Sequence, residues 1–366
     1  MRLSLQSGKE IPFDRSHGGA ADLTLLDFSA SINPLGPPPE AIDAFHAAAA
    51  SIERYPEPYA SSVIAGLGKW LGVDRANILA GNGSTQLFFL LVRVLRPRRP
   101  FVAIPTFSEI ANALLIAGVP ARAIALHRER GFELEPDDVH GALADGADAV
   151  FIGRPNSPTG SMLGLDAAAE IARDCAARRC WCVFDEAFID FAGNGHSAVA
   201  LVGSNPWVIV MRSLTKIFAI PGLRFGYVVA CKDLIARLAH DLEPWSVNCV
   251  AQRVASACLE SADAFCARVG AMIEAEGAYL SSGLSSLRGF RVFDSAANFL
   301  MIEVRDEPVS SPLARHMLER GIAIRDLREL PGCEPGFYRI AVRLRSDNER
   351  LLDAAAIYAQ QPITHK

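Results

Sequence analysis

Short apolar runs and helix-like segments alternate through the first two thirds of the chain, with polar loops between them. The apolar runs predict buried strands at residues 78–80, 101–104, 149–153, 182–184 and 207–211. Residues 86–95, which follow the first run, predict a buried helix. Strands that alternate with helices are typical of a parallel sheet covered by helices. We therefore expect an α/β domain in this part of the chain.

The pattern changes after about residue 245. Residues 248–287 are rich in alanine and helical in period, which predicts a long linker helix, and a small α+β domain is predicted from strands at 290–293, 299–304 and 338–342 with a helix at 312–320. We expect an N-terminal arm at 1–40 that belongs partly to the small domain, a large ligand-binding domain at 41–245, and the linker helix with the small domain at 246–366. A chain of 366 residues with 50% apolar content can bury cores of this size.

Polar loops follow four of the predicted strands. They contain Phe107, Asn156, Asp185 and Ser213. Because ligands of an open parallel sheet bind beyond the carboxyl ends of its strands, we expect these four loops to converge on one site. For Phe107 the alternative is ordinary core packing. For the proline-rich loop around Asn156 a tight turn is also expected, and the two interpretations do not compete.

A glycine loop lies between the first predicted strand and the helix at 86–95. Gly83 permits close approach of the backbone, and Ser84 and Thr85 add hydroxyls where the helix begins. Backbone N–H groups without partners concentrate at a helix start and favour an anion such as a phosphate. Taken alone, this glycine turn is weak evidence for such a site.

One lysine is placed differently from the other four in the chain. Lys216 follows a buried run and the Ser213 hydroxyl, and Arg224 lies eight residues further on. A lysine close to another cation and partly desolvated becomes a neutral amine that can trap an aldehyde. Asp185, at the end of its own apolar run, could keep a pyridine nitrogen protonated. These residues predict a pyridoxal phosphate site, with Ser213 and Arg224 as phosphate ligands; a surface lysine is the alternative.

Charge and composition exclude several classes of partner. The net charge of −5 comes from interspersed acids and bases, so nucleic acid is not expected to be the main partner. The first ten residues lack the apolar core of a signal peptide, and no segment is long and apolar enough for a membrane span, so we expect a cytoplasmic protein. The eight cysteines, including Cys180 and Cys182, are expected to be core residues, and no metal site is predicted. The basic cluster at 96–99 is expected to be a solvated helix end.

Two arginines lie in or near the strands predicted for the small domain. Arg325 and Arg339 would be surface residues in most proteins. Beside a cofactor cleft, however, two guanidinium groups could clamp a dianionic substrate.

Five motifs resemble those of the fold-type I pyridoxal phosphate enzymes of the histidinol-phosphate aminotransferase group, over nearly the whole chain. They are residues 81–84, 154–160, 185–188, 213–216 and 222–224. The resemblance implies a large domain with a mostly parallel seven-stranded sheet between helices, plus a small α+β domain. Within the group, residues 17–19 and 26–36 look like the branch that converts O-phospho-L-threonine to (R)-1-aminopropan-2-yl phosphate and carbon dioxide in cobalamin biosynthesis. The alternative is a 2-oxoglutarate-dependent histidinol-phosphate aminotransferase.

The same resemblance implies a role for each matching residue. Lys216 would form the Schiff base, Asp185 would pair with the ring nitrogen, Asn156 would bond the ring oxygen, Phe107 would stack on the ring, and the phosphate would be held by Gly83, Ser84, Thr85, Ser213 and Arg224. Tyr55 would reach the phosphate from the neighbouring subunit, which implies a homodimer with shared sites. The positions that match substrate ligands are His17, Gly18, Ser31, Asn156, Arg325 and Arg339, with Arg339 on the carboxylate and Arg325 on the phosphate.

Two positions depart from the pattern of these families. Phe188 stands where aminotransferases of the group usually have tyrosine, so one hydrogen bond to the cofactor is missing; this favours the decarboxylase. Ser31 stands where the decarboxylase tends to have asparagine, and it would reach substrate through a shorter hydroxyl. A binding or regulatory module without activity is disfavoured because the lysine, aspartate and phosphate ligands are all present.

Overall fold

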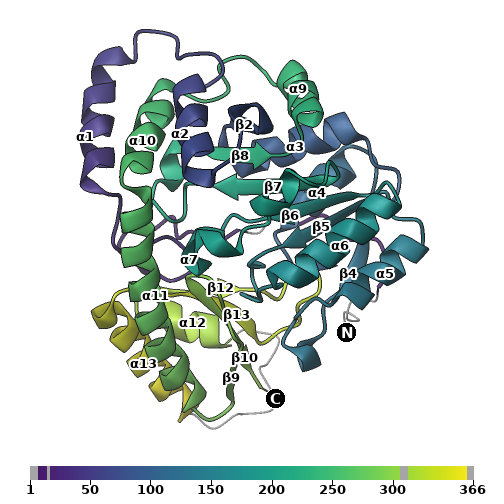
Figure 1. Cartoon of the computed structure of the whole chain (residues 1–366). Coiled ribbons are helices and arrows are strands. Elements are labelled where there is room, and N and C mark those ends of the chain that lie inside the picture. The colour runs from purple at the N-terminus through teal and green to yellow at the C-terminus, as the bar shows by residue number, and fades with distance from the viewer. Residues whose placement is uncertain (1–6, 15–16, 306–311, 361–366) are drawn as a thin grey trace.

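A seven-stranded sheet forms the centre of the larger part of the molecule, in the order β2-β8-β7-β6-β5-β3-β4 (Figure 1). Its strands are β2 (Ile78–Gly81), β3 (Pro100–Ile104), β4 (Arg122–Ala125), β5 (Ala149–Gly153), β6 (Trp181–Asp185), β7 (Val208–Ser213) and β8 (Gly226–Val229). All neighbours from β7 to β4 are parallel, and β8 is antiparallel to both β7 and β2. The computed structural model, which describes residues 7–14, 17–305 and 312–360, thus confirms the predicted mostly parallel sheet.

Helices cover both faces of this sheet. One face is covered by α3 (Gly83–Leu95), α4 (Ser108–Ile116) and α9 (Lys232–Asp241), and the other side of the sheet carries α2 (Ser61–Leu71), α5 (Pro136–Ala144), α6 (Leu165–Ala177) and the short helices α7 (Ile189–Ala192) and α8 (Val199–Val202). In β6, Val183 packs against the face covered by α3, α4 and α9, and Phe184 packs against the opposite face. Because successive side chains point to opposite faces, a strand buried on both sides must be apolar throughout. This is why continuous apolar runs predicted five of the seven strands, while β4 and β8 were not predicted from the pattern.

A four-stranded antiparallel sheet forms the second part, in the order β12-β13-β10-β9. Its strands are β9 (Phe290–Val292), β10 (Phe299–Val304), β12 (Arg325–Asp326) and β13 (Phe337–Ala341). Three helices lie beside it, α11 (Ala262–Ser285), α12 (Pro312–Leu318) and α13 (Arg345–Ala359) (Figure 1). A further pair of short strands, β1 (Leu26–Asp27) and β11 (Ile322–Ala323), joins the N-terminal region to this part of the chain.

The predicted single helix over 248–287 is two helices, so that prediction was wrong. α10 (Cys249–Glu260) ends before Ser261, and α11 begins after it. Ser261 leaves the helical region with φ −118° and ψ 16°, and its hydroxyl bonds the Glu40 carboxylate of α1 (Pro39–Ala48). The two helices also have different partners, since α10 packs on α1 and α2 whereas α11 packs on α13, α7 and β9. The break lets one apolar segment pack against both parts of the molecule.

The N-terminal region contacts both sheets. Near its start, the Gly8 and Ile11 amides donate to the carbonyls of Ala123 and Ala121 at the β4 edge, at 2.8 and 2.9 Å. Further on, β1 pairs in parallel with β11. The division of the chain at residues 40 and 245 stays a prediction. The first six residues, which the signal-peptide argument used in part, lie outside the described residues.

Short 3-10 turns complete the path of the chain, at Ala49–Ser51, Arg75–Asn77, Arg128–Arg130, Asn194–His196 and Pro221–Leu223. Across the described ranges, no helix has the length and apolar character that a membrane crossing requires.

Candidate active site

A cavity of about 520 Å³ lies beyond the carboxyl ends of β3, β5, β6 and β7. The small sheet and the N-terminal region close its other side. It brings together every predicted site residue except Asn156 and Tyr55, namely His17, Gly18, Ser31, Gly83, Ser84, Thr85, Phe107, Asp185, Ser213, Lys216, Arg224, Arg325 and Arg339. The convergence expected for an open parallel sheet is therefore found here.

Lys216 is the amine of this cavity. Burial lowers its pKa to about 8, and the charges of Arg339 and Arg224 act in the same direction, whereas Asp185 opposes them. Within the described part of the chain the amine makes no hydrogen bond or ion pair. A lysine with such a pKa is partly neutral near physiological pH and can act as a nucleophile.

Asp185 ends β6 and is buried. Burial raises its pKa to about 7, and the neighbouring Glu186 adds to the rise. The Ala187 amide donates to Asp185 Oδ1 at 3.1 Å, which favours the charged form, as does the charge of Lys216. A cationic partner in the cavity would lower this pKa, because an opposite charge stabilises the carboxylate. The site therefore has a carboxylate suited to a protonated ring nitrogen.

The first turn of α3 and Arg224 form an anion cradle. Gly83 has φ +79°, and a Cβ atom there would lie 2.7 Å from Arg224 Nη2. A Cβ atom on Gly226 would lie 2.2 Å from the Ser84 nitrogen. Glycine at both positions lets the guanidinium and the helix start lie against each other, with their donors at the cavity wall. This combination fits a phosphate group.

The Ser213 hydroxyl lies in the same wall. It shares a hydrogen bond of 2.7 Å with the Thr215 hydroxyl, and it donates to the Phe225 carbonyl at 3.3 Å. Each hydroxyl has one proton and two acceptor positions, so the pair can rearrange its protons toward an anion.

Arg339 and Arg325 lie opposite each other on neighbouring strands, β13 and β12. Arg339 donates from Nη1 to Ser157 Oγ at 2.9 Å and from Nη2 to the Ser29 carbonyl at 2.8 Å. Its Nε is buried and has no hydrogen-bond partner in the part of the chain that the structure describes. Burial lowers its pKa to about 10, and the charge of Arg325 contributes. No carboxylate lies within ion-pair distance among the described residues, so this half-buried cation fits an anionic ligand.

The N-terminal region passes over the cavity at His17 and Gly18. Arg325 Nη1 donates to the His17 carbonyl at 3.0 Å. A Cβ atom on Gly18 would lie 2.1 Å from the Ser29 carbonyl oxygen, so only glycine lets the chain pass this close. Ser31 also lines the cavity, and its hydroxyl is buried without a hydrogen-bond partner.

The two remaining predicted residues lie elsewhere. Asn156 is buried behind the wall, where its Nδ2 donates to the Pro105 carbonyl and to Thr159 Oγ1 at 2.8 and 3.0 Å, and its Oδ1 accepts from Thr106 Oγ1 at 2.7 Å. Tyr55 is 84% exposed and packs on Trp245 with ring centroids 5.1 Å apart, outside the cavity of its own chain. The roles that the resemblance implies for both residues stay predictions.

Several lining residues were given no individual role in the sequence analysis. Glu109, Ser157 and Thr106 are polar groups of the wall or directly behind it. Glu109 looks like an ordinary acid in the first turn of a helix, and Ser157 looks like part of a tight turn. The spacing of Glu109, two residues after Phe107 in a loop already assigned to the site, was the one clue to its position.

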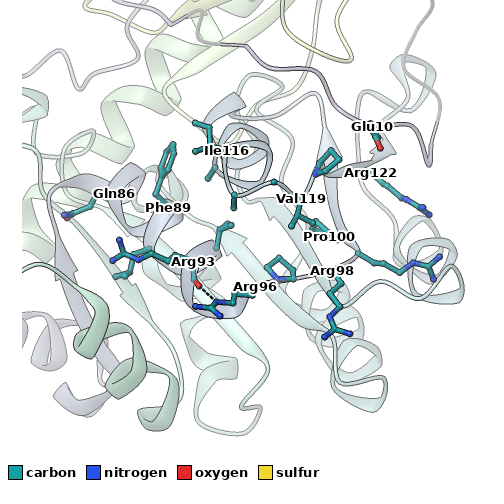
Figure 2. Close-up of a pocket in the computed structure, with 18 of the residues that line it drawn as sticks. Glu10, Gln86, Phe89, Arg93, Arg96, Arg98, Pro100, Ile116, Val119 and Arg122 are labelled. Carbon is teal, nitrogen blue, oxygen red and sulfur yellow. Dashed lines mark hydrogen bonds between the residues drawn. The ribbon is translucent and has the colours of Figure 1, made fainter.

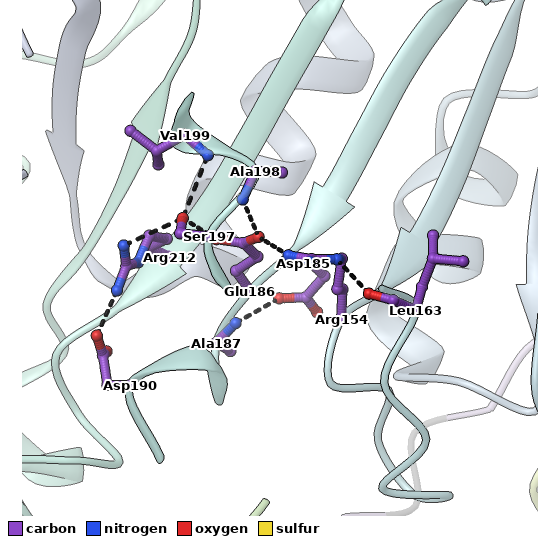
Figure 3. Close-up of polar contacts among 10 residues, drawn as sticks. All are labelled: Arg154, Leu163, Asp185, Glu186, Ala187, Asp190, Ser197, Ala198, Val199 and Arg212. Atoms are coloured by element: carbon purple, nitrogen blue, oxygen red, sulfur yellow. Dashed lines mark hydrogen bonds and ion pairs between the residues drawn. The ribbon is translucent and has the colours of Figure 1, made fainter. Parts of the chain in front are cut away.

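A network of buried ion pairs lies beside the cavity (Figure 3). Arg154 Nη1 and Glu186 Oε1 are 2.7 Å apart, and both side chains are fully buried. Ser197 Oγ donates to Glu186 Oε2 at 2.5 Å, and the Ala198 amide donates to Oε1 at 2.7 Å. Arg212 pairs with Asp190 in the same network. These contacts tie the segments that follow β5 and β6 to each other and to Arg212 of β7.

A larger cavity of about 950 Å³ lies between α3 and α4 (Figure 2). Its arginines are Arg93, Arg96, Arg98, Arg99 and Arg122. The cluster at 96–99 follows the end of α3, and its side chains are exposed except for Pro97, which confirms the solvated helix end. No predicted site residue lines this cavity, so the smaller cavity is the candidate active site.

Residues 24–354 match the model of the aminotransferase class I and II family. The chain belongs to this family of pyridoxal phosphate-dependent enzymes and has its fold-type I architecture.

Curated relatives have two kinds of name. The chain is 35% identical over 353 residues to a threonine-phosphate decarboxylase of Salmonella typhimurium, covering 93% of this chain and 96% of the relative. It is 33% identical to a histidinol-phosphate aminotransferase of Roseiflexus castenholzii, covering 90% and 88%. It is 29% identical to the adenosylcobalamin biosynthesis bifunctional protein CobDQ of Leptospira interrogans, covering 97% of this chain and 41% of that longer protein.

Solved structures divide in the same way. A histidinol-phosphate aminotransferase from Clostridium acetobutylicum matches with a TM-score of 0.85 and 25% identity, covering 92% of this chain and 99% of the other. An L-threonine-O-3-phosphate decarboxylase from Porphyromonas gingivalis matches with a TM-score of 0.81 and 24% identity, covering 91% and 99%. Both kinds of enzyme share this fold.

Proposed function

We propose that this protein is a pyridoxal phosphate-dependent decarboxylase of O-phospho-L-threonine, which forms (R)-1-aminopropan-2-yl phosphate and carbon dioxide in cobalamin biosynthesis. The observation that carries the proposal is the cavity, where Lys216, Asp185 and the Arg224 cradle face Arg325 and Arg339. The 35% identity to a threonine-phosphate decarboxylase over nearly the whole chain supports the choice of reaction.

The residues of the cavity fit the cofactor. Lys216 supplies the amine for its aldehyde, Asp185 supplies the carboxylate for its ring nitrogen, and the α3 start with Arg224 supplies donors for its phosphate. When bound, pyridoxal phosphate acts as a sink for the electrons left when a bond to the substrate α-carbon breaks. The remaining cofactor contacts, from Phe107 and Asn156, are carried over from the family resemblance.

The charges that remain suit the substrate. O-phospho-L-threonine carries a carboxylate and a phosphate, and after the cradle is assigned to the cofactor, Arg339 and Arg325 are left as cations. Arg339 binds the carboxylate, since it has no carboxylate partner of its own among the described residues, and Arg325 with His17 faces the phosphate. By fixing the orientation of the substrate carboxylate, Arg339 would direct the reaction toward loss of carbon dioxide.

The α-carbon must receive a proton after carbon dioxide leaves. Lys216 is the amine in the cavity, and its pKa of about 8 suits a group that holds and moves a proton near neutral pH. Phe188, Leu327 and Leu330 make the adjoining wall apolar, which limits access of water to the same region.

Histidinol-phosphate aminotransferase is the second candidate, because a relative of that name is 33% identical over most of the chain. Both substrates carry a phosphate, so the cationic cavity suits either. Phe188 favours the decarboxylase, since this buried ring packs edge-on against Phe299 and offers no hydroxyl to the cofactor.

We further propose a homodimer in which Tyr55 completes the partner's site. Its ring is exposed and lies outside the cavity of its own chain, as such a role requires. Sedimentation should give a dimer, and Tyr55→Phe should weaken cofactor retention if the hydroxyl contacts the phosphate. A monomeric, fully active protein would contradict the shared site.

The test is to supply the cofactor-loaded protein with O-phospho-L-threonine, and separately with histidinol phosphate and 2-oxoglutarate. We expect carbon dioxide from the first reaction and no glutamate from the second. Glutamate from the second reaction without carbon dioxide from the first would establish the aminotransferase.

A further inference from the structure

Glu109 is a buried carboxylate in a cavity dominated by cations. It lies in the first turn of α4 and lines the wall between Phe107 and the N-terminal region. Asn112, one turn further along the same helix and fully buried, donates from Nδ2 to Glu109 Oε1 at 2.9 Å. A carboxylate here would repel an anionic substrate, and the proposed function gives it no role. Its position therefore needs an explanation.

The contact that explains it is with His17. The His17 Nε2 and Glu109 Oε1 atoms are 3.1 Å apart. The His17 backbone carbonyl accepts from Arg325 Nη1 at 3.0 Å, so the same residue is held from both sides. A histidine that is half exposed in its side chain would otherwise turn freely toward solvent. Glu109 thus fixes both the ring orientation and the tautomer in which Nε2 carries the proton.

Helix α4 also binds an earlier part of the N-terminal region. Asn112 Oδ1 accepts from the Asp14 amide at 3.1 Å, and Asn112 Nδ2 also donates to the Asp14 carbonyl at 2.5 Å. The first turn of α4 therefore anchors the chain at Asp14 through Asn112 and at His17 through Glu109. Because α4 packs in the core of the large sheet, the anchor is rigid.

We propose that Glu109 is a positioning residue for recognition of the substrate's phosphate, which it serves by holding His17 and the adjacent Arg325 contact over the distal end of the cavity. This inference rests on the proposed function. Glu109 Oε1 accepts from both His17 and Asn112, and these two N–H donors partly compensate the charge of the carboxylate. Loss of the hydrogen bond between Glu109 and His17 would release the His17 side chain while leaving the cofactor cradle intact.

The test compares Glu109→Ala, Glu109→Gln and Asp233→Asn, all loaded with cofactor. Asp233 is an exposed acid in the first turn of α9, outside the cavity, and serves as the matched control. The measurements are the KM and kcat for O-phospho-L-threonine and the inhibition constant of L-threonine, which lacks the phosphate. Absorbance of the bound cofactor checks that each variant is loaded.

We expect Glu109→Ala to raise the KM about tenfold, the usual worth of a hydrogen bond that involves a charged group, with kcat within about threefold. The inhibition constant of L-threonine should not change, since it makes no phosphate contact. Glu109→Gln keeps an acceptor for His17 and should stay within about threefold of the wild type, as should Asp233→Asn.

Two results would overturn the inference. One is an unchanged KM in Glu109→Ala; the other is a parallel rise in the KM and in the L-threonine constant, which would indicate a general structural role. Should Glu109→Ala fail to fold, Glu109→Gln decides. Because glutamine keeps an acceptor for His17, a tenfold rise in the KM of Glu109→Gln would also overturn the inference. If the wild type releases no carbon dioxide from O-phospho-L-threonine, the proposed function fails first, and that outcome is visible before any variant is compared.

Discussion

The candidate cavity and the buried ion-pair network use neighbouring residues of the same strand ends in opposite ways. Asp185 lines the cavity, whereas Glu186, the next residue, pairs with Arg154 in the network (Figure 3). Ser213 lines the cavity, whereas Arg212, the residue before it, pairs with Asp190. The network compensates its charges within the chain. The cavity does not, and a buried charge without a partner is costly unless a ligand supplies one.

This difference separates residues that hold the fold from residues that bind a ligand. In the network, carboxylates and guanidinium groups meet at ion-pair distances and are fully buried. In the cavity, Lys216 has a lowered pKa, and neither Lys216 nor Arg339 has a carboxylate within ion-pair distance among the described residues. Unmatched cations beside a helix start indicate anionic ligands, here the phosphate of a cofactor and the two anionic groups of a substrate.

The largest effect should come from Lys216→Ala. Removal of the amine should reduce carbon dioxide release from O-phospho-L-threonine by on the order of 10³-fold or more, because the nucleophile and a proton carrier are lost together. Urea unfolding should show a stability close to the wild type, since the amine has no partner among the described residues. Activity that survives the substitution would contradict the assignment of Lys216 as the reactive amine of the cavity.

Arg154→Met tests whether the buried ion-pair network stabilises the fold. Loss of the guanidinium leaves Glu186 buried without its ion-pair partner and should lower the free energy of unfolding by about 3–5 kcal/mol. The matched control is Lys232→Met, whose ion pair with Asp74 is at least half exposed, so its loss should leave the free energy of unfolding almost unchanged. Urea unfolding of cofactor-free protein measures both variants, and equal losses would show that burial does not distinguish the two pairs.

Arg339→Ala should act on substrate and much less on cofactor. Removal of a charge that pairs with a buried carboxylate costs about 2–5 kcal/mol, so the KM for O-phospho-L-threonine should rise by at least tenfold. The cofactor spectrum should stay near that of the wild type. Arg345, an exposed residue at the start of α13 that pairs with Glu276 of α11, is the control position, and Arg345→Ala should leave the KM unchanged. A loss of cofactor in Arg339→Ala would instead assign this arginine to the cofactor.

The pKa of Asp185 predicts a pH dependence of stability in the cofactor-free protein. Burial raises this pKa from 3.8 to about 7, so between these values the folded state binds more protons than the unfolded state. The stability contributed by the protonated group is complete below pH 3.8 and is lost as the pH rises through about 7. The loss is at most about 1.4 kcal/mol for each pH unit.

Asp185→Asn should remove that contribution. The difference in unfolding free energy between the variant and the wild type should grow as the pH rises from 4 to 7 and then stay constant. Urea unfolding at several pH values checks this. A difference that does not vary with pH would mean that the carboxyl is charged in both states.

The sequence could predict much of the fold because the strands of a sheet buried on both faces must be apolar throughout. The same logic placed Asp185 and Ser213 at strand ends, where side chains of the cavity lie. The helix break at Ser261 was not predicted, since it depends on the different partners of α10 and α11.

The missed residues depend on contacts between distant parts of the chain. Glu109 has a partner 92 residues away in His17, and Arg212 has one 22 residues away in Asp190. Neither partner is visible in local spacing. A lysine in a motif with hydroxyls and a following arginine carries its own signal, whereas an acid in the first turn of a helix has an ordinary structural explanation.

The most direct test of the account is to load the protein with pyridoxal phosphate, reduce it with borohydride, and locate the modified lysine by peptide mass spectrometry. The account predicts a single cofactor label on Lys216, the amine with a lowered pKa in the cavity. A label on Lys69 or Lys232, or no stable label at all, would contradict the assignment of this cavity as the cofactor site.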